Sequence, residues 1–288
     1  MARRSGRARE ASLAYALLAP ALIVFAVFAY YPLYRLVDDA LHQQRLAGSG
    51  RAFVGVRGIF DVLSGHEFLS GAWITFQFML WTVPAGLVVG LLLAVLAHRR
   101  LKGIKIFQTI FSSTIASSVA VASVVFLTLV NHQSGYFQNV KFLDLSTPSG
   151  AMHGIALSSI WQNAGLTFII VLAGLQAVPE ELIEASILDG YGPVRRFFRI
   201  TIPSISPTLV FLAVILLVNA SQAYAQVDII TRGGPSQSTE TLLFKITQLQ
   251  GPTDLQQGAS MALGLFVLTF VLAALQFRIL DRRVHYGD

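Results

Sequence analysis

The charged residues of segment 178–207 are the first candidates for chemistry in this chain. Four carboxylates come first and three arginines follow: Glu180, Glu181, Glu184, Asp189, Arg195, Arg196 and Arg199. Between the carboxylates, Leu182, Ala185 and Leu188 recur at helical spacing, which predicts a short helix with one apolar side. Such a helix is too charged for the core of a bilayer and too apolar for a solvated tether. The sequence therefore predicts a surface that binds a protein partner.

The turn residues of this segment divide it into two short helices. Pro179 suits the first position of a helix, where its missing N–H costs nothing. Asp189-Gly190 is a typical helix end, and Gly192-Pro193 starts the chain again. The second helix has Val194, Phe197 and Phe198 on one side and the three arginines on the other. Pro203 and Pro207 then precede the next apolar run.

Composition sets the class of protein. The chain has 288 residues, a mean hydropathy of +0.63 and 12% charged residues, whereas a soluble domain has about 25% charged residues. This predicts an integral membrane protein. The sequence contains no cysteine, which excludes disulfide and cysteine–zinc chemistry. The net charge of +6 is better explained by basic residues beside membrane spans than by nucleic-acid binding, because no basic stripe with interleaved aromatic residues is present.

Six apolar stretches are long enough to cross about 30 Å of hydrocarbon. They are residues 13–34, 71–97, 106–130, 153–177, 208–227 and 259–277. The sequence thus predicts an all-α polytopic membrane protein with six transmembrane helices. The basic segment 1–12 before the first stretch would also suit a signal peptide, but no A-x-A cleavage site follows, so we interpret 13–34 as a span.

The distribution of basic residues predicts the topology. Segments 1–12, 98–105, 178–207 and 278–288 together hold 14 of the 21 Lys and Arg residues. This excess places both termini and segment 178–207 in the cytoplasm. The chain then divides into a cytoplasmic basic N-terminus, 1–12, and a membrane domain, 13–288.

Two spans contain residue patterns with more than one interpretation. Gly86, Gly90 and Ala94 are spaced for the close approach of another helix, with a hinge as the alternative, and Pro84 predicts a kink. Span 106–130 carries six hydroxyls: Ser112, Ser113, Thr114, Ser117, Ser118 and Ser123. These hydroxyls either line a wet path or bond back to their own helix.

Polar groups in two other spans are candidates for a substrate pathway. They are Gln162 and Asn163 in span 153–177, and Asn219, Gln222 and Tyr224 in span 208–227. Amides in a bilayer cost free energy unless they are hydrogen-bonded, so bonds between helices are the alternative. No span has a central Asp, Glu, Lys or Arg, which disfavours an ion-coupled carrier. The absence of a P-loop sequence excludes ATP hydrolysis by this chain, so we do not expect an enzyme.

The spacing within segment 178–207 resembles a known motif. Glu184-Ala185-Ser186 is followed by three residues and Gly190, then by nine residues and Ile200-Thr201-Ile202-Pro203. This pattern resembles the EAA loop of bacterial ABC-importer permeases and departs from it only at Ser186 and Ile202. In that family the loop, between spans 4 and 5, is the coupling helix that docks into a cytoplasmic ATPase.

The resemblance implies a role for each matching residue. Glu184 would make a polar contact to the ATPase, with Asp189 as its neighbour at the helix end. Ala185 and Leu188 would fill the ATPase groove, and Gly190 would permit a left-handed bend. The alternative for Glu184 is a solvated helix face.

The resemblance also implies the partners and the location. We expect a second homologous permease, a dimer of the ATPase and an external substrate-binding protein, in a bacterial inner membrane. No cofactor is expected in this chain, since ATP and Mg²⁺ would be bound by the ATPase.

A second motif narrows the family. Thr231 and Gly233-Gly234-Pro235, with Thr239 and Thr241, resemble the T-x-G-G-P segment of the sugar-type (maltose-transporter-like) permeases, although a plain turn is the alternative. Leu243-Phe244-Lys245-Ile246 and Gln276-Phe277-Arg278 are most similar to the first permease subunit of glycerol-3-phosphate and glycerophosphodiester importers. An importer of maltose- or trehalose-like oligosaccharides is the alternative, and a stand-alone carrier or channel is a further one.

Overall fold

The computed structural model describes residues 15–44, 50–98, 103–131, 135–249, 251 and 254–281. The basic segment 1–12 and most of the basic residues predicted at 98–105 and 278–288 lie outside these ranges. The chain forms two compact units. The first contains residues 1–65 and 249–264, and the second contains residues 66–248 and 265–288.

The first unit begins with a long helix, Tyr15–Leu41, whose last part is α2 (Tyr31–Leu41). It continues past the predicted end of the first span at residue 34. A small antiparallel hairpin of β1 (His42–Gln44) and β2 (Arg51–Phe53) follows, and then α3 (Gly55–Leu63). Arg51 lies 3.0 Å from carboxylate oxygens of both Asp38 and Asp39, which ties the hairpin to α2.

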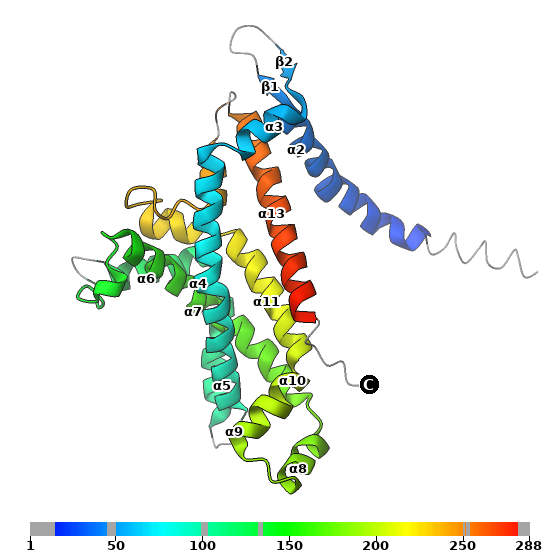
Figure 1. Cartoon of the computed structure of the whole chain (residues 1–288), viewed down its shortest axis with the longest axis vertical. Coiled ribbons are helices and arrows are strands. Elements are labelled where there is room, and N and C mark those ends of the chain that lie inside the picture. Colours follow the sequence, from blue (N-terminus) through cyan, green and yellow to red (C-terminus); the bar gives the residue numbers. More distant parts are fainter. Residues whose placement is uncertain are drawn as a thin grey trace, which may run out of the picture. The chain divides into compact units, whose positions relative to one another are not determined.

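The second unit is built on α4 (His66–Ala97), α7 (Pro148–Gln176), α11 (Ser206–Ser221) and the C-terminal part of α13 (Leu255–Asp281), as Figure 1 shows. Small residues of α4 permit the close packing predicted from their spacing. A Cβ on Gly90 would overlap the Thr167 side chain of α7, and one on Gly86 would lie 3.6 Å from Leu216 of α11. The helix α4 continues through Pro84 without interruption.

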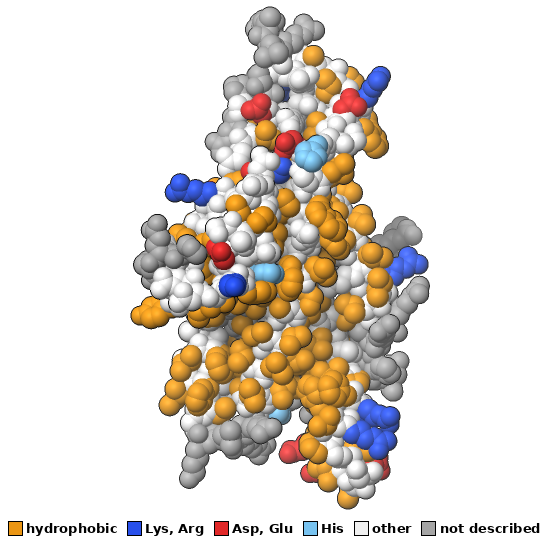
Figure 2. All heavy atoms as spheres, turned by 60° about the vertical axis from the view of Figure 1, so that its left-hand side comes forward, with side chains coloured by type: hydrophobic (Ala, Val, Ile, Leu, Met, Phe, Trp, Pro, Cys, Tyr) orange, Lys and Arg blue, Asp and Glu red, His pale blue; other side chains and the backbone are white. Residues whose placement is uncertain are grey.

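Four helices of the described residues are long and apolar enough to cross a membrane, or six if two bent pairs each form one span. The four are Tyr15–Leu41, α4, α7 and Leu255–Leu280. The two bent pairs are 104–116 with 119–130, and 193–204 with 206–221. Figure 2 shows hydrophobic side chains over much of the surface of one face, as expected where a helix faces lipid.

The prediction of one continuous helix over 106–130 is wrong. α5 (Ile104–Ser112) continues as a 3₁₀ turn to Ala116, and α6 (Val119–Val130) then leaves at 105°. Ser117 and Ser118 both adopt extended backbone conformations, and the Ser118 hydroxyl accepts a hydrogen bond of 3.2 Å from the Val121 N–H. Serine competes with helix through such bonds, and here it starts a new helix.

The hydroxyls of this segment bond to nearby backbone. Five of the six donate to carbonyls three or four residues earlier, at 2.7–3.3 Å: Ser112, Ser113, Thr114, Ser117 and Ser123. The sixth, Ser118, is the cap of α6. Of the two interpretations offered by the sequence, local bonding is the one that the structure supports.

The span predicted over 208–227 also ends early. α11 stops at Ser221, and a π-helical turn, Val227–Thr231, follows after a short break. The segment after it contains α12 (Leu242–Gln248). Asn219 therefore lies in the last turn of α11, whereas Gln222 and Tyr224 lie beyond its end.

Candidate functional site

The first helix of segment 178–207 is α8 (Glu180–Leu188). It ends as its Asp-Gly pair predicts. Gly190 has φ +77°, the Tyr191 N–H donates to the Ser186 carbonyl at 2.9 Å, and the Gly190 N–H donates to the Ile187 carbonyl at 3.0 Å. This pair of bonds is the Schellman motif, which needs a residue in the left-handed conformation. The predicted helix end and the reason for Gly190 are confirmed.

The residues predicted to contact an ATPase lie on the free side of α8. Glu184, Ala185 and Asp189 are exposed, and Leu188 is 89% exposed. Leu182 and Ile187 are also about half exposed. A run of exposed aliphatic side chains on a short helix is typical of a surface that another protein covers. The role of this surface stays a prediction, since no partner is present.

A second helical stretch follows at the predicted position. It consists of α9 (Pro193–Arg196), a π-helical turn over Phe197–Thr201 and α10 (Ile202–Ser204). The Arg195 guanidinium lies 4.3 Å from the centre of the Tyr191 ring. We call α8 and this stretch together the coupling segment, 180–204, after the role predicted for it.

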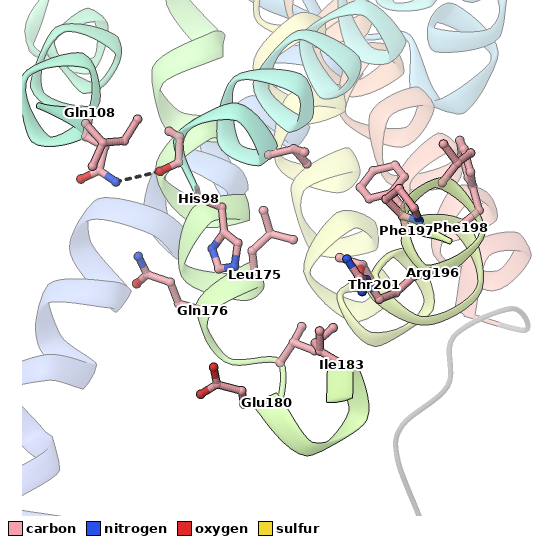
Figure 3. A pocket seen from close by; sticks show the side chains of 16 residues that line it. His98, Gln108, Leu175, Gln176, Glu180, Ile183, Arg196, Phe197, Phe198 and Thr201 are labelled. Carbon is pink, nitrogen blue, oxygen red and sulfur yellow. Dashed lines mark hydrogen bonds between the residues drawn. The ribbon is translucent and has the colours of Figure 1, made fainter. Parts of the chain in front are cut away.

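The coupling segment encloses a cavity of about 910 Å³ against the ends of two long helices (Figure 3). Its lining includes Val95 and His98 at the end of α4, Leu175 at the end of α7, and Ile183 and Arg196 of the coupling segment. The end of α4, the start of α5, the end of α7 and the coupling segment therefore meet at one end of this unit.

A second cavity, of about 440 Å³, brings together all five predicted pathway residues. They come from α7, from the end of α11 and from the chain just after it: Gln162, Asn163, Asn219, Gln222 and Tyr224. The Gln162 amide nitrogen also donates to the Ser117 carbonyl at 3.4 Å. Both interpretations of Gln162, as a cavity residue and as a link between segments, thus have support.

Sequence reasoning missed three polar residues of this cavity, Thr82, Ser159 and Gln226. The Gln226 amide donates to the Ser159 hydroxyl at 3.0 Å, and both side chains are buried. Ser159 precedes Gln162 and Asn163 by one helical turn, so helical periodicity would have identified it. The lining contains no Asp, Glu, Lys or Arg among the described residues. Its chemistry suits a neutral, hydroxyl-bearing group.

The T-x-G-G-P segment is part of a network of hydrogen bonds. The Thr231 and Thr239 hydroxyls lie 2.8 Å apart, and Thr239 also donates to the Gly234 carbonyl at 3.0 Å. Gly233 has φ +83°, and an added Cβ would lie 2.7 Å from Glu240. The glycine is therefore required both by its conformation and by its surroundings.

The segment after it is anchored to the start of α4. Thr241 donates to the Ala223 carbonyl at 2.6 Å, and the Leu242 N–H donates to the Thr75 hydroxyl at 2.8 Å. Lys245, which is 8% exposed, lies 2.7 Å from Glu67 and 3.4 Å from Glu240. It also donates to the Ser70 hydroxyl at 3.1 Å. We call residues 223–248 the outer segment, because the topology predicted from the sequence places them outside.

A helical membrane unit with an exposed amphipathic coupling segment and a polar internal cavity has the organisation of a transporter subunit. Residues 66–286 match the family described as "Binding-protein-dependent transport system inner membrane component". The chain belongs to this family of permease subunits.

Individual relatives agree with this assignment over nearly the whole chain. The sn-glycerol-3-phosphate transport system permease protein UgpA of Shigella flexneri is 32% identical, with 96% of this chain and 97% of the relative covered. The protein of the same name from Yersinia enterocolitica is 33% identical, covering 95% and 96%. A permease chain from the crystal structure of a bacterial alginate ABC transporter, in complex with an alginate-bound periplasmic protein, has a TM-score of 0.80. It is 20% identical and covers 97% of this chain and 98% of its own, which supports the fold alone.

Proposed function

We propose that this chain is one permease half of an ATP-driven importer for glycerol-3-phosphate or glycerophosphodiesters such as glycerophosphocholine. The observation that carries the proposal is the relation to sn-glycerol-3-phosphate permeases across 96% of the chain. The alignment includes both the coupling segment and the cavity residues. The same proposal assigns residues 13–288 to one permease domain behind a basic N-terminus, 1–12.

Six membrane crossings with both termini in the cytoplasm follow if each bent pair of helices contributes one crossing. One geometric feature supports this topology. The end of α4, the end of α7 and the coupling segment line one cavity, so His98 and Ile104, on either side of the basic run, lie at the same end of the second unit as the coupling segment. This arrangement agrees with the excess of Lys and Arg in the segments assigned to the cytoplasm.

The coupling segment is proposed to transmit ATPase motion. On its exposed face, Glu184 and Asp189 would make polar contacts to the ATPase, and Ala185 and Leu188 would fill a groove of the ATPase. Gly190 would hold the turn that ends α8. The loop has only to make different contacts with two ATPase states in order to shift the permease between conformations. ATP and Mg²⁺ would be bound by the ATPase dimer, so this chain is neither an enzyme nor a holder of cofactors.

Two further partners complete the proposal. A second homologous permease would supply the other half of the pathway, and an external binding protein would deliver the substrate. The cavity lined by Asn163, Asn219 and Gln222 would contact the hydroxyls of the substrate. Because no cationic side chain of the described residues lines it, recognition of the phosphate would fall mainly to the external binding protein.

The same feature favours a second candidate substrate. A neutral cavity lined by amides and hydroxyls suits an oligosaccharide such as a maltose- or trehalose-like sugar equally well. The architecture and the coupling segment would be unchanged. A stand-alone carrier or channel is less supported, because it leaves the exposed face of α8 without a use.

Uptake by a strain that lacks this chain tests the proposal. Labelled glycerol-3-phosphate, glycerophosphocholine and trehalose would be compared side by side, with the restored gene as control. Loss of the phosphate-bearing substrates alone is the expected result. Loss of trehalose alone would transfer the assignment to a sugar importer, and normal uptake of all three would contradict both.

A further inference from the structure

The second stretch of the coupling segment enters a membrane span at a steep angle. Residues 193–204 are bent by 68° from 206–221, with a break at Ile205. The stretch carries Arg195, Arg196 and Arg199, so it cannot lie in hydrocarbon. A charged amphipathic helix bent this far from a span at its cytoplasmic start lies along the membrane surface. This step rests on the proposed topology.

The side chains of this stretch divide into a basic set and an apolar set, and both are accessible. Val194 is 70% exposed and Phe198 is 65% exposed, while Arg195 and Arg199 are exposed as well. Among the described residues, no salt bridge is formed by these arginines, although α8 nearby carries four carboxylates including its cap. Figure 2 shows Lys and Arg side chains beside hydrophobic ones at the lower end of the view.

The cavity behind this stretch is mostly apolar, and its lining includes Arg196. Its wall includes Val95, Leu175, Ile183 and Phe197, and its volume of about 910 Å³ is in the range of ligand sites. In Figure 3, Arg196 lies with Phe197, Phe198 and Thr201 on one side, while Glu180 lies on the other. A ligand with a negative head and a hydrocarbon tail would match the arginine side and the apolar wall.

We propose that residues 193–201 and this cavity bind an anionic phospholipid of the cytoplasmic leaflet. The lipid phosphate would lie among Arg195, Arg196 and Arg199, since guanidinium groups pair well with phosphate oxygens. Val194 and Phe198 would enter the acyl region, and one acyl chain would occupy the cavity. The lipid would thereby contact the coupling segment on the side away from the exposed face of α8.

Binding of a fluorescent phosphatidylglycerol to the purified full-length chain tests this site. Each arginine at an anionic surface contributes roughly fivefold, so R195Q/R199Q is expected to weaken binding by roughly 30-fold. R195K/R199K should stay close to wild type, because it keeps the charge. R57Q/K141Q removes two exposed charges outside the segment and should leave the affinity unchanged. Ile183→Trp, which narrows the cavity, should weaken binding with all arginines present.

The other outcomes overturn the proposal. Three results would each refute the lipid site. They are the same phosphatidylglycerol affinity in R195Q/R199Q as in wild type, the same loss of affinity in R57Q/K141Q as in R195Q/R199Q, or binding of phosphatidylcholine as tight as that of phosphatidylglycerol. Displacement of the lipid by inorganic phosphate would indicate a free-anion site, and unchanged binding by Ile183→Trp would refute the acyl-chain site. If R195Q/R199Q kept the lipid but lost the ATPase on co-purification, the arginines would belong to a protein interface. Substrate uptake and ATPase retention by the wild-type chain test the proposed function, whereas phosphatidylglycerol binding tests the lipid site. Failure of one proposal can therefore be distinguished from failure of the other.

Discussion

The coupling segment and the outer segment both belong to the second unit, but they differ in whether their side chains are packed and hydrogen-bonded within the chain. The outer segment bonds to α4 through Leu242 and Thr75, and it buries Lys245 beside Glu67. The coupling segment leaves Leu188 89% exposed. The outer segment is therefore packed within its own chain, whereas the coupling segment leaves apolar groups exposed on the surface.

The two segments also differ in the surroundings of one glycine in each. Gly190 and Gly233 both have positive φ, at +77° and +83°. No atom lies within 4 Å of a Cβ built on Gly190, whereas one on Gly233 would lie 2.7 Å from Glu240 and 3.0 Å from Phe244. Gly190 is needed only for the conformation of its turn, whereas Gly233 is needed for both the conformation and the packing.

The largest expected effect is on the coupling segment. Glu184→Lys reverses the charge on the exposed face of α8, and Gly190→Asp strains the turn that orients it. We expect each variant to reach the membrane at the wild-type level and to lose uptake of labelled substrate. Lys141→Glu, a charge reversal at an exposed position outside the segment, is the control. Normal uptake in both variants would remove the assignment of α8 as the coupling helix.

Replacing each of the two glycines by alanine separates the cost of the left-handed conformation from the cost of overpacking. Gly190→Ala should cost about 1 kcal/mol of stability from the left-handed conformation alone. Gly233→Ala adds overpacking against Glu240, for a total of about 2–4 kcal/mol. Thermal unfolding of the purified chain in detergent measures the difference. Equal midpoints for the two variants would show that the outer segment is not packed as described.

Lys245→Met tests the ion pairs that anchor the outer segment. The methionine keeps the apolar stem but leaves Glu240, which is 20% exposed, without its cation. A loss of about 1–3 kcal/mol is expected, with a lower unfolding midpoint and unchanged co-purification of the ATPase. Combining it with Glu240→Gln should restore part of the stability. An unchanged midpoint would mean that Lys245 adds nothing to the anchor.

In the polar cavity we expect a smaller effect on uptake than in the coupling segment. Asn163→Asp adds a carboxylate of nearly the same shape, which would repel a phosphate-bearing substrate. We expect glycerol-3-phosphate uptake to fall by roughly tenfold, equivalent to about 1.4 kcal/mol. Asn163→Ser is the neutral control. Equal uptake by the two variants would place the substrate away from Asn163.

The sequence was sufficient for the features that depend on local chemistry. The Asp189-Gly190 pair predicted the end of α8, and the spacing of Gly86 and Gly90 predicted close helix packing. The family followed from the pattern between Glu184 and Pro203. Each of these signals lies within a few residues of the feature that it specifies.

Features that depend on distant residues were not predicted. The 105° break after Ala116 was also missed, although the extended backbone at its two serines is a local feature. The outer segment is fixed by bonds such as that from Leu242 to Thr75, which are 167 residues apart. Gln226 and Ser159 meet in the cavity across 67 residues of chain. No local pattern contains such pairings.

Co-purification of the ATPase with Leu188→Asp tests whether the exposed face of α8 binds the ATPase. Leu188 makes little contact with its own chain, so the variant should fold and reach the membrane normally. We predict that the tagged wild-type chain retains the ATPase and that Leu188→Asp loses both the ATPase and substrate uptake. Full retention of the ATPase together with normal uptake would contradict the account, because the exposed face of α8 would then bind nothing that transport requires.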